Sequence, residues 1–300
     1  MNSEIVKYNN GNMVVKLYDD GTKIREYPDN EKPKPEFPES IDLKITSICK
    51  HNCPFCYDNC NDKGRHCKIS DLEVIFDRDY PGVEVAIGGG NPLLHPELTN
   101  ILYFLKSKKM IANITINQSD IKSYFKYINR LISDNLLYGI GISVNNCDTL
   151  IEDSKLINGH KVYHTIVGVF PLESYEKMMK LDDDIIRILV LGFKNKGRGV
   201  EYYSKNRRII REWALLFGMF FNSIFSSKCI VAFDNLAIEQ LRLKEILSKQ
   251  LLDKHYLGDD GQFSMYIDAT NMRYAKNSLA ENTHSIDNQN LINIFKSLTT

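Results

Sequence analysis

Three cysteines lie close together in the segment 49–56, CKHNCPFC, and their side chains are suited to binding a metal centre. Three residues separate Cys49 from Cys53, and two residues separate Cys53 from Cys56. Thiolates are ligands for zinc, other soft metals and iron–sulfur clusters. Three thiolates can hold three irons of a four-iron cluster and leave the fourth iron open to a small chelating ligand. A zinc site more often pairs two short cysteine groups far apart in the sequence, and no second group of that kind is visible here.

The cysteines and a second, glycine-rich segment both follow stretches that predict β-strands. The alternating run at 41–45 precedes the cysteines, and the apolar run at 83–87 precedes Gly88-Gly89-Gly90-Asn91-Pro92. Glycine allows the backbone to approach a ligand closely. In α/β folds the site forms at the carboxyl ends of the strands, so we expect the two segments to share one site.

These two segments resemble the signatures of one enzyme superfamily. The cysteine spacing, with Phe55 before the third cysteine, is similar to the radical S-adenosylmethionine (radical SAM) motif, and segment 88–92 resembles the Gly-Gly-Glu-Pro segment of that superfamily. The resemblance covers about residues 41–200 and identifies no particular member. It implies a [4Fe–4S] cluster held by Cys49, Cys53 and Cys56, with SAM bound at the open iron.

The resemblance also implies which residues contact SAM. Segment 88–91 is expected to bind the amino group of its methionine half, but Asn91 stands where the superfamily has glutamate and brings no charge. Ser143 and Asn145 resemble the contacts to the ribose and carboxylate. The stretch 166–168 is expected to form an apolar wall for adenine. The full set of expected cofactor contacts is Phe55, Gly88, Gly89, Gly90, Asn91, Ser143, Asn145, Gly168 and Lys194.

Lys194 belongs to a basic, glycine-rich segment, 191–199, that is typical of an anion site or a flexible lid. Together with the basic residues between 205 and 211 it suggests a phosphate or carboxylate on the substrate, although a solvated helix face explains that run as well.

Strand and helix patterns alternate along the middle of the chain. Apolar residues at helical spacing occupy 98–105 and 121–132, and such crossover helices favour a parallel sheet. The predicted strands are 41–45, 83–87, 112–116, 138–144, 162–170 and 185–191. The resemblance implies that they form an α/β fold, an open (β/α)6 partial TIM barrel. Later segments predict helices at 202–225 and 236–253, strands at 229–233 and 263–267, and a short final helix.

We therefore expect three regions. Residues 1–40 hold a β-hairpin at 12–27, with Asp20-Gly21 in its turn, and a proline-rich linker. The hairpin either covers a sheet edge or touches the substrate. Residues 41–200 form the partial barrel, and residues 201–300 an α+β C-terminal extension.

Composition limits the class of protein. The 300 residues are 43% hydrophobic and 25% charged, with 38 basic and 38 acidic residues, as in a soluble globular protein without a charge that attracts nucleic acid or membranes. Four of the seven cysteines lie within 49–60, which indicates metal binding rather than a disulfide scaffold. No signal-peptide core and no run of 18 apolar residues is present, so we expect a cytoplasmic protein with no membrane partner.

The remaining cysteines leave several possibilities open. Cys60 and Cys67 are either bystanders or ligands of a second metal, and Cys60, His51 or His66 would complete a zinc site if the cysteines bound zinc instead. Cys147 and Cys229 are expected to be buried as small hydrophobic residues.

The predicted function is that of an oxygen-sensitive radical SAM enzyme. The resemblance implies reductive cleavage of SAM to a 5′-deoxyadenosyl radical that abstracts hydrogen from a substrate, with a flavodoxin or ferredoxin as low-potential electron donor. The substrate is a peptide or protein, or a small anionic metabolite. The alternative is a zinc-stapled or SAM-binding module without catalysis.

Overall fold

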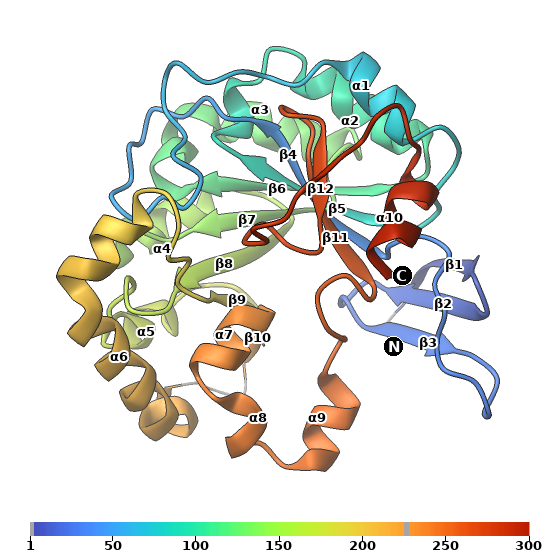
Figure 1. Cartoon of the computed structure of the whole chain (residues 1–300). Helices are drawn as coiled ribbons and strands as arrows, with labels where there is room; N and C mark the ends of the chain where they lie inside the picture. The colour runs from blue at the N-terminus through green and yellow to red at the C-terminus, as the bar shows by residue number, and fades with distance from the viewer. Residues whose placement is uncertain (1–2, 225–227, 300) are drawn as a thin grey trace.

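A large mixed β-sheet forms the centre of the molecule (Figure 1). The computed structural model describes residues 3–224 and 228–299. The sheet has ten strands in the order β10-β9-β8-β7-β6-β5-β4-β11-β12-β13. Eight of them are parallel: β4 (Ser40–Thr46), β5 (Glu84–Gly89), β6 (Ile111–Asn117), β7 (Gly139–Ser143), β8 (His160–Ile166), β9 (Ile186–Leu191), β10 (Cys229–Phe233) and β11 (Ser264–Asp268). Two short antiparallel strands, β12 (Arg273–Ala275) and β13 (His284–Ser285), extend the β11 edge.

Helices connect the parallel strands and surround the sheet in Figure 1. They are α1 (Ile69–Ile75), α2 (Leu98–Ser107), α3 (Ile121–Ser133), α4 (Cys147–Lys155), α5 (Ser174–Met178) and α6 (Gly199–Ile224), with one-turn 3₁₀ helices η1 (Pro92–Leu94) and η2 (Gln118–Asp120). The apolar face predicted for α2 is buried from Leu98 to Leu105. On β6, Ala112, Ile114 and Ile116 are buried, whereas the alternate polar residues line an internal cavity.

The mixed α/β class with a large parallel sheet is confirmed, but the sheet is larger than expected. The six strands predicted for the barrel correspond to β4–β9. The strands predicted at 229–233 and 263–267 are β10 and β11, which add one parallel strand to each side of these six. Within residues 3–224 and 228–299 no pairing joins β10 to β11, so the sheet stays open.

Two predicted elements differ from the structure because local turns interrupt them. Strand β8 ends at Ile166, and the predicted strand 162–170 was too long: Gly168 lies in a turn with φ +72° and packs against Ile210 of α6. The predicted helix 236–253 is three short helices, α7 (Asn235–Gln240), α8 (Leu243–Ile246) and α9 (Lys249–His255). Arg242 adopts the left-handed conformation between the first two, and Ser248 caps the third.

The remaining predictions for the C-terminal region concern its first and last helices. Helix α6 begins at Gly199, three residues before the predicted start at 202, and residue 225, the end of that prediction, lies outside the described residues. The final helix is α10 (Leu291–Thr299). None of the helices in the described ranges combines the length and apolar character needed to cross a membrane.

A small antiparallel sheet precedes the large one. Its strands are β1 (Glu4–Asn10), β2 (Met13–Tyr18) and β3 (Lys23–Glu26), drawn in blue in Figure 1. The β2–β3 turn contains Gly21 at φ +89°, and the Asp20 carboxylate accepts from the Thr22 backbone N–H at 2.9 Å. Tyr138 donates to the Asp19 carbonyl at 2.8 Å, and the turn lines the internal cavity.

Candidate functional site

A partly open cavity of about 590 Å³ is lined by the parallel strands and the loops that follow them. Most of the residues predicted as cofactor or metal contacts line it: Cys49, Cys53, Phe55, Cys56, Gly88, Gly89, Gly90, Asn91, Ser143 and Lys194. Asn145 and Gly168 are not among its lining residues. The Asn145 amide donates to Asn117 Oδ1 at 2.7 Å, and Gly168 packs against α6, so neither prediction of a cofactor contact is supported.

The three predicted metal ligands sit on the loop that follows β4. All three are free thiols of intermediate burial. Within the loop the Cys56 backbone N–H donates to the Cys53 carbonyl at 3.2 Å, and the Cys49 N–H donates to Asn61 at 2.8 Å. These contacts fold the loop back on itself, so that the three thiols open onto one cavity.

Arg198 fastens this cysteine loop to the start of α6. Its guanidinium donates to the carbonyl of Cys53 at 2.9 Å and to that of Cys60 at 3.1 Å, and its backbone N–H donates to Cys56 O at 3.0 Å. Gly197 lies so close that an added Cβ would be 2.5 Å from the Tyr57 carbonyl. Arg198 is therefore a support for the loop, which argues against the anion-site or lid role considered for segment 191–199.

The thiols differ in their surroundings. Burial, and to a smaller extent the nearby charges of Cys56 and Asp120, raise the pKa of Cys49. Burial also raises the pKa of Cys53. A hydrogen bond from the Cys60 thiol lowers the pKa of Cys56 to about 6.

The donor set fits an iron–sulfur cluster better than a single ion. Within the described ranges, no three His, Cys, Asp or Glu side chains are placed to share one metal ion. A tetrahedral zinc site draws its ligands to about 2.3 Å from one centre. In a cluster each thiolate binds a different iron, so the cysteines need only surround the same space. Two of the expected zinc partners also have other contacts: His51 bonds to Asp120, and His66 packs against the ring of His95.

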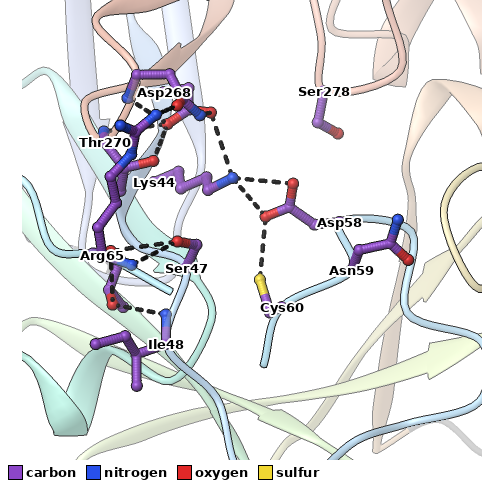
Figure 2. A network of polar contacts seen from close by, with 12 residues as sticks. Lys44, Ser47, Ile48, Asp58, Asn59, Cys60, Arg65, Asp268, Thr270 and Ser278 are labelled. Carbon is purple, nitrogen blue, oxygen red and sulfur yellow. Dashed lines mark hydrogen bonds and ion pairs between the residues drawn. The ribbon is translucent and has the colours of Figure 1, made fainter. Parts of the chain in front are cut away.

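A buried ion-pair network joins the cysteine loop to two strands (Figure 2). Figure 2 shows Lys44 of β4 reaching both Asp58 of the loop, at 2.7 Å, and Asp268 of β11, at 3.3 Å. Asp58 also accepts from the Cys60 thiol at 3.2 Å, and Asp268 accepts from Thr270 at 2.6 Å. Burial opposes the charge on Lys44, but Asp58 and Asp268 outweigh it and raise the pKa of Lys44, so its ammonium stays charged.

The glycine segment combines tight packing with open space. An added Cβ would lie 2.3 Å from Thr46 O at Gly89, where φ is +105°, and 2.3 Å from Ile48 O at Gly90. At Gly88 an added Cβ would meet no atom within 4 Å. Gly89 and Gly90 therefore hold the loop against the end of β4, whereas Gly88 leaves its backbone open to a ligand in the cavity.

Asn91 belongs to a hydrogen-bonded group with Asp120 and His51. Its side chain is 5% exposed; Oδ1 accepts from the Leu93 backbone N–H at 3.1 Å, and Nδ2 donates to Asp120 Oδ2 at 3.0 Å. The same oxygen of Asp120 lies 2.7 Å from His51 Nε2. Asp120 and His51 both line the cavity. The sequence analysis assigned no role to Asp120, and the available signal was an acidic residue directly before the predicted helix 121–132.

The other predicted contacts have local structural partners. Phe55 packs edge-on against Tyr202, with ring centroids 5.8 Å apart. Lys194 lies 4.2 Å above the Tyr57 ring and donates to Ser278 Oγ at 2.8 Å. Cys67 and Cys147 are buried, and Cys229 is partly buried. The basic face of α6 is paired with its own helix, since Lys205 contacts Glu201 and Arg208 contacts Glu212.

Comparison with known proteins gives matches only at the level of structure. No protein-family model matches the sequence, and no curated protein matches it. The chain is similar to Streptococcus suis SuiB bound to precursor peptide SuiA, with a TM-score of 0.56, 14% identity and coverage of 87% of this chain and 65% of that chain. For SuiB bound to S-adenosylmethionine the TM-score is 0.56, the identity 15% and the coverage 87% and 66%.

The matched region spans just under two thirds of the length of SuiB, and identities this low show a shared fold alone. The chain thus shares its fold with SuiB, a protein whose structures include complexes with S-adenosylmethionine and with a precursor peptide.

Proposed function

We propose that the protein is a radical SAM enzyme, with a [4Fe–4S] cluster on Cys49, Cys53 and Cys56 and SAM in the adjoining cavity. The observation that carries this proposal is that the three free cysteines and the glycine segment, which follow the carboxyl ends of β4 and β5, line one cavity. When reduced, such a cluster supplies the electron that cleaves SAM to methionine and a 5′-deoxyadenosyl radical, which abstracts hydrogen from the substrate.

The chain's own residues hold and enclose these groups. The cysteine loop is fixed from one side by Arg198 and from the other by Lys44 through Asp58. Gly88 leaves room for the backbone to approach SAM, and the position of Ser143 at the cavity wall, at the end of β7, supports a contact from that side. The walls include Ile166, Leu189 and Leu191, whose apolar side chains help to keep water away from the reacting atoms.

A peptide or protein is the favoured substrate class. SuiB is known in a structure bound to its precursor peptide, and this chain shares that fold. The small N-terminal sheet also has two edge strands, β1 and β3, that are available for strand addition. A small anionic metabolite is less well supported, because Arg198 donates to the cysteine loop and Lys194 to Ser278. A low-potential donor of the flavodoxin or ferredoxin type would supply the electron, in a reducing cytoplasm.

The test is anaerobic reconstitution with iron and sulfide, followed by reduction with dithionite in the presence of SAM. We expect wild-type protein to bind about four irons per chain, as the cluster requires, and to release 5′-deoxyadenosine, detected by chromatography. C53S should do neither, whereas the matched variant C229S, which changes a cysteine of β10 away from the loop, should behave as wild type. Uptake of zinc with refusal of iron would show that the proposal is wrong. Iron and SAM binding without the nucleoside, with or without candidate peptides, would point instead to a non-catalytic module.

A further inference from the structure

The carboxylate of Asp120 lies at the cavity wall and makes no hydrogen bond to the helix that follows it. Asp120 lies between β6 and α3 along the chain; it is 9% exposed and lines the cavity. Asp120 ends η2 with helical backbone angles, φ −80° and ψ −18°, directly before α3, and its side chain makes no hydrogen bond to the start of α3. Instead, Asn91 and His51 both direct their donors to Asp120 Oδ2. The side chain is therefore oriented toward the site and not toward the helix.

The charge of this carboxylate has no fixed cationic partner. Neither Asn91 nor His51 carries the permanent charge of a lysine or arginine. Across residues 3–224 and 228–299, no lysine or arginine forms an ion pair with Asp120; the nearby Lys122 pairs with Asp153 at 3.5 Å. No hydrogen bond within the same ranges engages Asp120 Oδ1. Buried charges are generally paired, so a buried carboxylate with a free oxygen at a cavity favours a cationic ligand there.

Asn91 cannot itself bind a cationic ligand strongly. Its side-chain oxygen already accepts from the Leu93 N–H, and that contact fixes the orientation of the amide, so the face directed to Asp120 is a donor. An ammonium needs an acceptor, and Asn91 offers it only the remaining lone pair of a neutral oxygen. The neighbouring Asp120 is thus the acidic group nearest to the position where the motif has lost its charge.

We propose that Asp120, positioned by Asn91 and His51, binds the α-ammonium of SAM. This inference rests on the proposed function and deepens it. Asp120 also lies close to the cysteine loop, since His51 belongs to that loop and the charge of Asp120 reaches Cys49. The ammonium of a ligand bound beside the thiols would therefore meet the free oxygen of Asp120. The negative charge is supplied from the loop after β6 in place of the loop after β5.

The test measures SAM binding without turnover. Reconstituted wild type, D120N, N91E/D120N and D134N are dialysed anaerobically, without reductant, against labelled SAM and against an analogue in which hydrogen replaces the α-amino group. Iron per chain is measured for each. A charge-assisted hydrogen bond lost in D120N should weaken SAM binding about ten- to a hundred-fold and leave the affinity for the analogue unchanged. N91E/D120N, which moves the carboxylate to the neighbouring side chain, should recover most of the loss. D134N, at the exposed far end of α3, should match wild type.

The outcomes separate the two proposals. If wild type cleaves SAM while D120N binds SAM as tightly as wild type, the assignment of Asp120 is overturned and the proposed function stands. An equal loss of affinity for SAM and for the analogue also overturns the assignment, because Asp120 would then only shape the cavity. If wild type holds iron but binds no SAM, both proposals fail. If D120N loses iron and N91E/D120N keeps it, the double variant gives the answer. Tight SAM binding by N91E/D120N supports the assignment, and weak SAM binding by N91E/D120N with full iron overturns it.

Discussion

The ion-pair network around Lys44 predicts a large loss of stability when its ammonium is removed. The Lys44 side chain is 6% exposed and neutralises two carboxylates, Asp58 with 20% and Asp268 with 12% of the side chain exposed. K44M keeps most of the volume of the side chain but leaves both carboxylates without a cation. Removing one partner of a buried ion pair generally costs about 3–5 kcal/mol. Because water reaches part of Asp58, and Thr270 and Asn271 still donate to Asp268, we expect a value near the lower limit, about 3 kcal/mol.

The assay is urea unfolding of the apoprotein, in which this loss should lower the midpoint by on the order of 1 M. K44M/D58N removes one of the two stranded charges with an amide of the same shape, and should recover about half of the loss. The control is K205M, because Lys205 and Glu201 are 69% and 74% exposed, and such surface pairs contribute about 0–1 kcal/mol.

The same substitution should act on the cysteine loop, since Lys44 reaches it through Asp58. After reconstitution, K44M should lose iron to a chelator faster than wild type, and K205M should not. If K44M unfolds within about 1 kcal/mol of wild type, as an exposed pair would, the network is not a buried ion pair and the argument from Figure 2 is refuted.

Four further variants test other parts of the site. G88A should fold with unchanged stability and bind SAM more weakly, because its methyl group enters open space in the cavity, whereas G90A places a Cβ 2.3 Å from Ile48 O and should cost about 1–3 kcal/mol in urea unfolding. R198K keeps the charge but not the fork that reaches two loop carbonyls, so it should release iron to a chelator faster than wild type; equal rates would count against the role of Arg198. Burial lowers the pKa of His164 from 6.5 to about 4, so folding excludes a proton that the unfolded chain binds. The stability of the apoprotein should therefore fall as the pH decreases from 6.5 to about 4, and H164Q should show a shallower fall; identical pH profiles would contradict this.

Sequence patterns predicted correctly the strands and helices whose apolar spacing is regular within a short segment. Strands β4 to β9 and helices α2 and α3 follow from alternating or helical apolar spacing. The errors occur where an apolar run continues through a turn. Residues 167–170 are apolar because they pack beside α6, and the run hides the end of β8 at Ile166. Arg242 in the left-handed conformation breaks the helix predicted over 236–253 without the glycine that usually signals such a break.

The hairpin predicted at 12–27 corresponds to β2 and β3, with Asp20-Gly21 in its turn, whereas the neighbouring strand β1 was not predicted. The contact of Asp19 with Tyr138 joins residues 119 positions apart, and no spacing rule within the hairpin predicts it. The turn lines the cavity, which agrees with the expectation that the hairpin touches the substrate, and that contact stays a prediction.

The residues of the site likewise fall into those that a local motif predicts and those that long-range contacts bring together. The cysteine and glycine segments are short motifs and were found as such, whereas Asp120 meets Asn91 across 29 positions and His51 across 69. Read by itself, Asn91 is a departure from a motif and suggests weak binding or lost catalysis. In the folded chain the same amide orients a carboxylate from the next strand. The charge available to a ligand is a property of the whole cavity wall, so one neutral residue in a motif is weak support for a non-catalytic protein.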